Sequence, residues 1–141
     1  MPSSLLVALQ LAALAAVVMP WGGAWHHLGV GPLAASAALG AWTLLHNRPG
    51  NFGIFPEPRT NARLVTTGPY ALARHPMYLA VLLFAAGFAL GWQRMPNVLA
   101  LAVLAAVLHA KASREERLLR QRFPEYADYA ARTARIIPGL R

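Results

Sequence analysis

Residues 64–84, LVTTGPYALARHPMYLAVLLF, change character after Tyr78. Turn-forming, aromatic and charged residues are concentrated before that point, and residues 79–84 are entirely apolar. Pro76 suits the first turn of a helix, because proline fixes φ near the helical value and the N–H group that it lacks would have no partner there. The sequence therefore predicts a helix over residues 76–92, with His75 as its N-cap and a polar segment leading into it.

Three further apolar runs cover residues 4–20, 33–46 and 96–112. With 57% hydrophobic and 13% charged residues, the chain has the composition of a membrane protein. The runs are shorter than the roughly 20 residues that span a bilayer, so we expect membrane thinning or extension of the helices into the interface. The prediction is an all-α integral membrane fold with four short transmembrane helices in a single domain, residues 1–141.

The distribution of basic residues predicts the orientation. Twelve of the thirteen fall in the same two segments: eight from Lys111 onward and, before the third helix, Arg48, Arg59, Arg63 and Arg74. Because positively charged residues favour the cytoplasmic side, we predict that both termini and the loop over residues 47–75 are cytoplasmic, in a membrane such as the bacterial inner membrane. The first apolar run lacks a basic start and a convincing cleavage site, so we expect a retained helix rather than a signal peptide.

Helical periodicity continues past the fourth apolar run, so we expect a helix over residues 96–122 whose end extends into the cytoplasm. A second amphipathic segment, residues 125–137, follows Pro124, and we predict that it forms a C-terminal amphipathic helix. Its apolar and aromatic residues, among them Tyr126 and Tyr129, are available to lie against the bilayer or to cover a site. The mixed charges also fit a merely solvated face, since i,i+4 pairs stabilise a helix by only about 0.2–0.5 kcal/mol each.

Two blocks of sequence, in this order, resemble the isoprenylcysteine carboxyl methyltransferase and phospholipid methyltransferase family of integral membrane enzymes. The first block is LVTTGPYALARHPMY, and the second is EERLLRQRFPEYADYAARTARIIPGL, which begins at Glu115. The resemblance covers roughly residues 51–140. Taken alone, the first block fits equally well a belt of interfacial tyrosines around a helix that begins with proline.

The resemblance implies that S-adenosylmethionine is the methyl donor. The residues that it implies for cofactor binding are Leu64, Val65, Tyr70, His75, Pro76, Met77, Tyr78, Glu115 and Glu116. For catalysis it implies Glu115, which would close the cofactor pocket, and Lys111, which takes the place of a family arginine that contacts the acceptor. A helix N-terminus and His75 suit the carboxylate of the donor, and tyrosine faces with a carboxylate suit its sulfonium cation.

The implied reaction is an in-line displacement at the methyl carbon, which depends on the orientation of two reactants. The donor is water-soluble, but four spans suit a membrane-resident acceptor, so we expect a lipidic or hydrophobic acceptor at the cytoplasmic interface. Whether the acceptor group is a carboxylate, an amine or a thiol stays open; an amine needs a base, for which Glu115, Glu116 and His109 are candidates. The alternatives are a non-enzymatic membrane scaffold or transporter subunit and a membrane reductase.

We expect neither a metal site nor nucleic-acid binding. His26, His27, His46 and His109 lack the spacing of metal ligands, and we interpret them as interfacial histidines. The chain has no cysteine, which excludes thiolate sites, and no RNA- or DNA-reading motif accompanies its net charge of +8. Residues 47–61, rich in Pro, Gly and Asn, are either an idle connector or a loop over the cofactor, and their place before the first block favours the loop.

Overall fold

The computed structural model describes residues 1–47, 51, 53–57 and 60–140. Within these residues the regular elements are all helices, so the all-α fold class is confirmed. The elements are α1 (Ser3–Val18), the 3₁₀ turn η1 (His27–Gly29), α2 (Val30–His46), α3 (Pro69–Leu72), α4 (Pro76–Trp92), α5 (Met95–Arg122) and α6 (Tyr126–Arg132). Three basic residues that entered the orientation prediction, Arg48, Arg59 and Arg141, lie outside the described residues.

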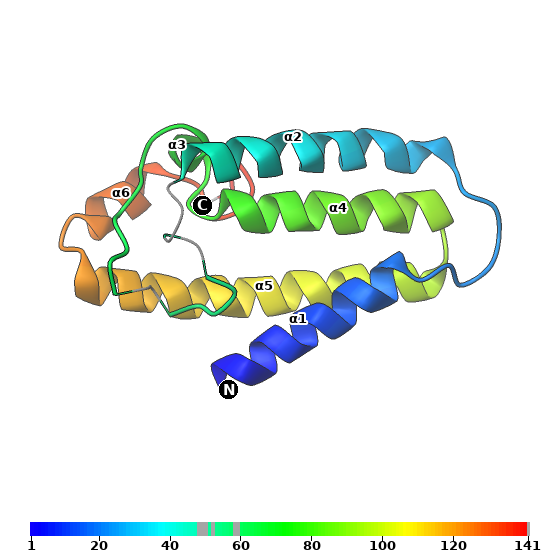
Figure 1. Cartoon of the computed structure of the whole chain (residues 1–141), viewed down its shortest axis with the longest axis horizontal. Helices are drawn as coiled ribbons and strands as arrows, with labels where there is room; N and C mark the ends of the chain where they lie inside the picture. The colour runs from blue at the N-terminus through cyan, green and yellow to red at the C-terminus, as the bar shows by residue number, and fades with distance from the viewer. Residues whose placement is uncertain (48–50, 52, 58–59, 141) are drawn as a thin grey trace.

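The long helices form an elongated bundle (Figure 1). α2 and α4 lie side by side, α4 packs on α5, and α1 crosses α5 at an angle. A tight turn joins α4 to α5, and within it Gln93 takes a left-handed φ of 53°. α3, α6 and the C-terminus gather at the end of the bundle where α4 begins (Figure 1), so polar segments that are distant in the sequence meet there.

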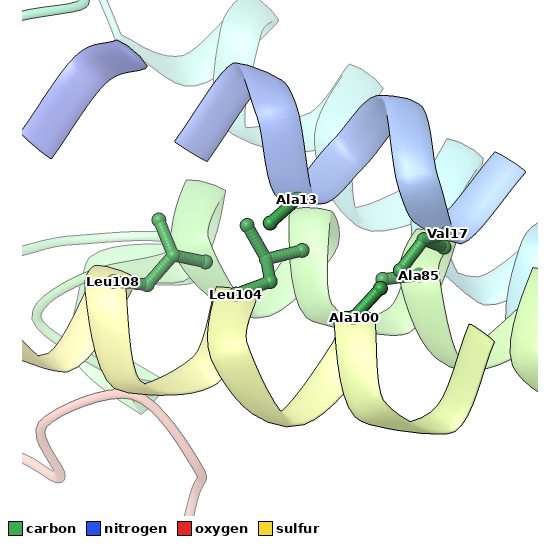
Figure 2. Close-up of a cluster of buried hydrophobic side chains, with 6 residues drawn as sticks. All are labelled: Ala13, Val17, Ala85, Ala100, Leu104 and Leu108. Carbon is green, nitrogen blue, oxygen red and sulfur yellow. The ribbon is translucent and has the colours of Figure 1, made fainter. Parts of the chain in front are cut away.

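The core between α1, α4 and α5 consists of small and branched side chains. It contains Ala13, Val17, Ala85, Ala100, Leu104 and Leu108, which face one another across the three helices (Figure 2). Small side chains let helix backbones approach closely, which is how helices pack in a lipid environment. Helices α2 and α4 also approach closely. A Cβ atom on Gly87 would lie only 2.6 Å from Cγ of Leu33, so this contact has no room for a larger side chain.

Asn97 fixes the end of α1 to the first turn of α5. Its side chain is buried, and Nδ2 donates hydrogen bonds to the carbonyl oxygens of Val17 at 2.6 Å and Met19 at 3.0 Å. The last carbonyls of a helix have no donor within the helix, and leaving them buried without a partner would be costly. The amide of Asn97 therefore stabilises the junction at the end of the bundle opposite α6.

Two helical stretches have the length and composition that a membrane span requires. Residues His27–His46 (20 residues) and α5 (28 residues) are long and apolar enough to cross a membrane, whereas α1 and α4, with 16 and 17 residues, are shorter apolar helices. The predicted helices, residues 4–20, 33–46, 76–92 and 96–122, agree with α1, α2, α4 and α5 to within three residues at each end. The number of four spans, which depends on how the bilayer meets α1 and α4, stays a prediction.

The C-terminal segment differs from its prediction. An amphipathic helix was predicted over residues 125–137, but α6 ends at Arg132 and the chain then runs back beside the start of α4. The N–H groups of Arg74 and His75 donate to the carbonyl oxygens of Ala134 (2.8 Å) and Arg135 (3.0 Å), and these backbone bonds replace a further helical turn. The segment is thereby held against the junction of α3 and α4.

Candidate functional site

A cavity opens at the end of the bundle where α3, α4, α5 and α6 meet. Its lining combines polar, aromatic and charged groups with a few aliphatic ones. The lining residues are Asn47, Asn51, Gly53, Ala62, Arg63, Leu64, Val65, Tyr70, Arg74, His75, Pro76, Met77, Tyr78, Glu115, Leu119, Tyr126 and Tyr129. Segments that lie far apart in the sequence therefore contribute to one site.

All four tyrosines of the chain line this cavity. The hydroxyl of Tyr129 donates to the carbonyl oxygen of Tyr70 at 2.6 Å, and Nδ2 of Asn47 donates to the hydroxyl of Tyr70 at 2.8 Å. Burial raises the pKa of Tyr70 to about 12, and burial also raises the pKa values of Tyr126 and Tyr129 above the ordinary value for tyrosine. The phenols are therefore neutral at physiological pH and present aromatic faces rather than negative charges.

Glu115 brings a carboxylate to the cavity. Its side chain is 31% exposed, and Oε2 accepts a hydrogen bond from the hydroxyl of Tyr78 at 2.9 Å. The ring of His75 stacks on the ring of Tyr78, with centroids 5.1 Å apart and 7° between the planes, and its Nδ1 lies 3.6 Å from the same Oε2. The first turn of α4 thus positions a carboxylate that belongs to α5.

Glu116, the next residue, lies behind this group and outside the cavity lining. Its side chain is 8% exposed, and Oε1 accepts a hydrogen bond from Nε of Arg74 at 2.8 Å. The same oxygen lies 3.2 Å from Nε2 of His75 and 3.4 Å from Nε of Arg135. Consecutive residues of an α-helix are about 100° apart around its axis, so the two glutamates reach different surroundings. Glu116 joins α4 and the C-terminal segment to α5.

Lys111 is fully enclosed by protein groups. Its side chain is buried, and Nζ donates to Oε1 of Gln10 in α1 and, at 2.8 Å, to the carbonyl oxygen of Ile54. Nζ also lies 5.6 Å from the centroid of the Tyr78 ring, but Lys111 is not among the residues that line the cavity. In this structure its ammonium group connects α1 and the segment around Ile54 to α5.

His75 occupies the N-cap position of α4, and Pro76 is its first residue, as predicted. The side chain of His75 makes no capping hydrogen bond, because the ring is turned toward the two glutamates. The imidazole is therefore already engaged with carboxylates of the chain, whereas the sequence suggested that it receives a carboxylate of the cofactor. That role stays a prediction.

The structure brings most of the predicted site residues together. Those that line the cavity are Leu64, Val65, Tyr70, His75, Pro76, Met77, Tyr78 and Glu115, and those that do not are Lys111 and Glu116. Sequence reasoning did not assign to the site seven further polar or large residues of the lining: Asn47, Asn51, Arg63, Arg74, Leu119, Tyr126 and Tyr129. The sequence carried a signal for most of them. Arg74 lies in the first block of the resemblance, and Leu119, Tyr126 and Tyr129 lie in the second. Asn47 and Asn51 belong to the segment that was expected to form a loop over the cofactor, and Arg63 carried no such signal.

The remaining histidines lie outside this group. Nε2 of His46 lies 3.0 Å from the hydroxyl of Thr67, and Nε2 of His109 lies 3.4 Å from the guanidinium of Arg135. His26 and His27 are exposed near η1, at the far end of the bundle. Among the described residues, no group of three or more His, Asp or Glu side chains is placed to hold a metal ion.

An apolar helical bundle with two helices long enough to cross a membrane and a polar cavity at one end is typical of an integral membrane protein with a ligand site at the interface. The sequence pattern of the phospholipid methyltransferase family matches residues 25–126. The chain therefore belongs to the phospholipid methyltransferase family, and the resemblance seen in its two sequence blocks is confirmed.

Two bacterial relatives carry names from metal resistance. The cobalt-zinc-cadmium resistance protein CzcN of Cupriavidus metallidurans is 38% identical over 88 residues, which are 62% of this chain and 41% of that protein. The nickel-cobalt-cadmium resistance protein NccN of Alcaligenes xylosoxydans xylosoxydans is 34% identical over 88 residues, with the same shares of 62% and 41%. The chain thus matches less than half the length of each relative.

Proposed function

We propose that this chain transfers a methyl group from S-adenosylmethionine to a hydrophobic, membrane-resident acceptor at the cytoplasmic face of a bacterial inner membrane. The observation that carries the proposal is the cavity that all four tyrosines line together with Glu115, whose carboxylate accepts a hydrogen bond from Tyr78. Membership of a methyltransferase family supports the reaction type. The apolar bundle, with the cavity at one end, supports an acceptor that reaches the site from the membrane.

The lining fits a ligand that combines a cation with polar groups. A sulfonium cation is attracted by aromatic faces and by a nearby carboxylate, which Tyr78 and Glu115 supply together. The ligand's carboxylate would find positive charge at Arg63 and at the N-terminus of α4. Leu64, Val65, Tyr70, His75, Pro76, Met77 and Tyr78 would form the walls.

S-adenosylmethionine, when bound, supplies a methyl group that is already activated for transfer. The chain's contribution is then mainly orientation, because holding the two reactants in line can lower the activation free energy by a large amount. Glu115 is held by the hydroxyl of Tyr78 at 2.9 Å, so its charge is fixed at the cavity before any ligand binds. For an amine or thiol acceptor, the same carboxylate takes up the proton that the nucleophile loses.

Lys111 takes a different role in this proposal from the one that the family resemblance implied. Its ammonium group donates to Gln10 and Ile54, so we propose that it fixes α1 and the neighbouring segment beside the cavity. Lys111 therefore gives no indication of the charge of the acceptor group. That the acceptor has a hydrophobic part is better supported, because the exposed surfaces of the long helices are rich in large apolar side chains.

The names of the two relatives favour a second candidate function. A non-enzymatic membrane subunit that serves a metal-resistance system would use the bundle for packing and would not need the cavity. Such a protein would have no affinity for a nucleoside ligand and would tolerate loss of the Glu115 carboxylate. Ligand binding therefore separates the two functions.

The first prediction is direct binding of the demethylated cofactor. Titration of the purified protein in detergent with S-adenosylhomocysteine should show saturable binding by calorimetry with a micromolar dissociation constant, equivalent to about −8 kcal/mol. NADPH serves as the control ligand and should give no binding. Absence of heat with S-adenosylhomocysteine would contradict the methyltransferase proposal, and binding of NADPH instead would favour a reductase.

A further inference from the structure

Arg63 brings to the cavity a positive charge that its neighbours leave unpaired. The residue lines the cavity and is exposed. Its two hydrogen bonds within the described part of the chain are made by its backbone N–H and carbonyl groups, and the guanidinium group has no partner among these residues. The guanidinium group is therefore available to a ligand in the cavity.

The other cationic side chains near the cavity are already engaged with protein groups. Nε of Arg74 donates to Glu116 at 2.8 Å, and its Nη1 donates to two backbone carbonyl oxygens. The ring nitrogens of His75 lie 3.2 and 3.6 Å from carboxylate oxygens, and Lys111 is buried outside the lining, where Nζ donates to two protein oxygens. Within the described part of the lining, Arg63 is therefore the cationic side chain that remains for an anionic group of a ligand.

The side-chain amide of Asn51 holds the backbone of Arg63. Oδ1 of Asn51 accepts a hydrogen bond from the N–H of Arg63 at 2.8 Å, and Nδ2 donates to the carbonyl oxygen of Arg63 at 2.9 Å. A primary amide offers an acceptor and donors side by side, so one side chain can pair with both backbone groups of one residue. Arg63 thus starts from a fixed backbone position at the cavity, and less conformational entropy is lost when a ligand binds to it.

Asn51 is itself anchored to the wall of the cavity. Its Nδ2 also donates to Oδ1 of Asn47 at 2.8 Å, and Nδ2 of Asn47 donates to the hydroxyl of Tyr70 at 2.8 Å. Asn47 is buried at the C-cap of α2, and the hydroxyl of Tyr129 in α6 donates to the carbonyl oxygen of Tyr70 at 2.6 Å. A continuous chain of hydrogen bonds therefore runs from α6 through Tyr70 and the two amides to the backbone of Arg63.

We propose that Arg63 binds the carboxylate at the amino-acid end of S-adenosylmethionine, and that Asn51 is the positioning residue that holds Arg63 at the cavity. The inference rests on the proposed function, and it gives to Arg63 the carboxylate contact that the sequence suggested for His75. A guanidinium group pairs with a carboxylate through two parallel hydrogen bonds. Glu115 brings the opposite charge to the same cavity, so the two side chains together match a ligand whose amino-acid end carries both a carboxylate and a cation.

The inference is tested with two ligands that differ at the amino-acid end. Methylthioadenosine shares the nucleoside and the thioether of S-adenosylhomocysteine but has no carboxylate. By calorimetry, Arg63→Gln should lower the affinity for S-adenosylhomocysteine about 10- to 100-fold, as expected for a hydrogen-bonded pair of charges, and leave the affinity for methylthioadenosine unchanged. The unfolding midpoint without ligand should also stay unchanged, because the guanidinium group has no partner among the described residues.

Arg63→Lys and Arg117→Gln are the control variants. Lysine keeps the charge without the planar fork, so Arg63→Lys should lose less affinity for S-adenosylhomocysteine than Arg63→Gln. Arg117 is exposed on α5 and does not line the cavity, so Arg117→Gln should leave the affinity unchanged. If Arg63→Gln weakens both ligands equally, Arg63 does not bind the carboxylate and the inference is wrong. Where methylthioadenosine binds too weakly to measure, equal losses in Arg63→Lys and Arg63→Gln have the same meaning.

Asn51→Leu tests the positioning role separately. Removing the amide should cause the same selective loss as Arg63→Gln but a smaller one, because the guanidinium group is still present. In the double variant, Asn51→Leu should add little to the loss caused by Arg63→Gln, because the side chain that it positions is gone. Losses that add fully would overturn the role of Asn51, and an unchanged affinity for S-adenosylhomocysteine in Arg63→Gln would overturn the role of Arg63. If the unmutated protein binds neither ligand, the proposed function fails and the inference fails with it.

Discussion

Glu115→Gln should lower the rate of methyl transfer by about 100-fold or more, the range expected when a general base or a fixed charge is removed from a reacting centre. Glutamine keeps the size and still accepts a hydrogen bond from Tyr78, but it removes the negative charge that faces the cavity. The partly exposed side chain of Glu115 carries little of the fold, so the unfolding midpoint should change little. Initial rates with labelled methyl donor and thermal unfolding in the same detergent measure both effects.

Glu125→Gln is the matched control. Glu125 is exposed at the N-cap position of α6 and does not line the cavity, so the same change of charge there should leave the transfer rate unaltered. An unchanged rate in Glu115→Gln would remove Glu115 from the reaction. An equal loss in both variants would show that net charge, rather than this carboxylate, controls the rate.

Substitution of the neighbouring residue, Glu116→Gln, should lower the free energy of unfolding by about 3–5 kcal/mol, the cost of removing one of the two charges of a buried ion pair. Removing this charge leaves the guanidinium of Arg74 without its carboxylate at 2.8 Å and removes the negative partner of His75. Because Arg135 also approaches Glu116, the C-terminal segment should loosen. Denaturant unfolding gives the free energy of unfolding, and limited proteolysis after residue 132 reports the loosening.

Glu57→Gln provides the comparison for this second effect. Glu57 pairs with Arg114 at 3.1 Å, but both side chains are exposed, so loss of the pair should cost about 1 kcal/mol or less. A Glu116→Gln variant that is as stable as the unmutated protein and has lost only its affinity for S-adenosylhomocysteine would contradict the structural role of Glu116. Such a result would instead support the cofactor-binding role that the resemblance implied for Glu116.

The long helices were predictable because their apolar runs are continuous and punctuated by proline. Pro76 and Pro96 mark the starts of α4 and α5 to within one residue. The short helix α3 and the end of α6 were not predictable in the same way. Residues 133–137 carry apolar side chains in an amphipathic pattern, but backbone bonds from Arg74 and His75 to Ala134 and Arg135 decide their conformation. Hydrogen bonds between segments that are distant in the chain cannot be predicted from the local sequence.

The candidate site was predictable where residues act through a local motif. The segment around His75 and Tyr78 and the carboxylate of Glu115 meet at the cavity, as the two blocks suggested. From the sequence alone, the adjacent residues Glu115 and Glu116 could not be assigned different roles. The structure separates them, because the carboxylate of Glu116 pairs with Arg74. Likewise, the partners of Lys111 come from α1 and from Ile54, neither of which shares a motif with it.

The most direct test of the central claim is the fate of a labelled methyl group. The purified protein is incubated with labelled S-adenosylmethionine and a total membrane lipid extract, and the product is separated between organic solvent and water. The account predicts label in the organic phase with the unmutated protein and a signal about 100-fold lower with Glu115→Gln. Label confined to water-soluble products would contradict a lipidic acceptor, and no transfer by a protein that binds S-adenosylhomocysteine would contradict methyl transfer to a membrane lipid.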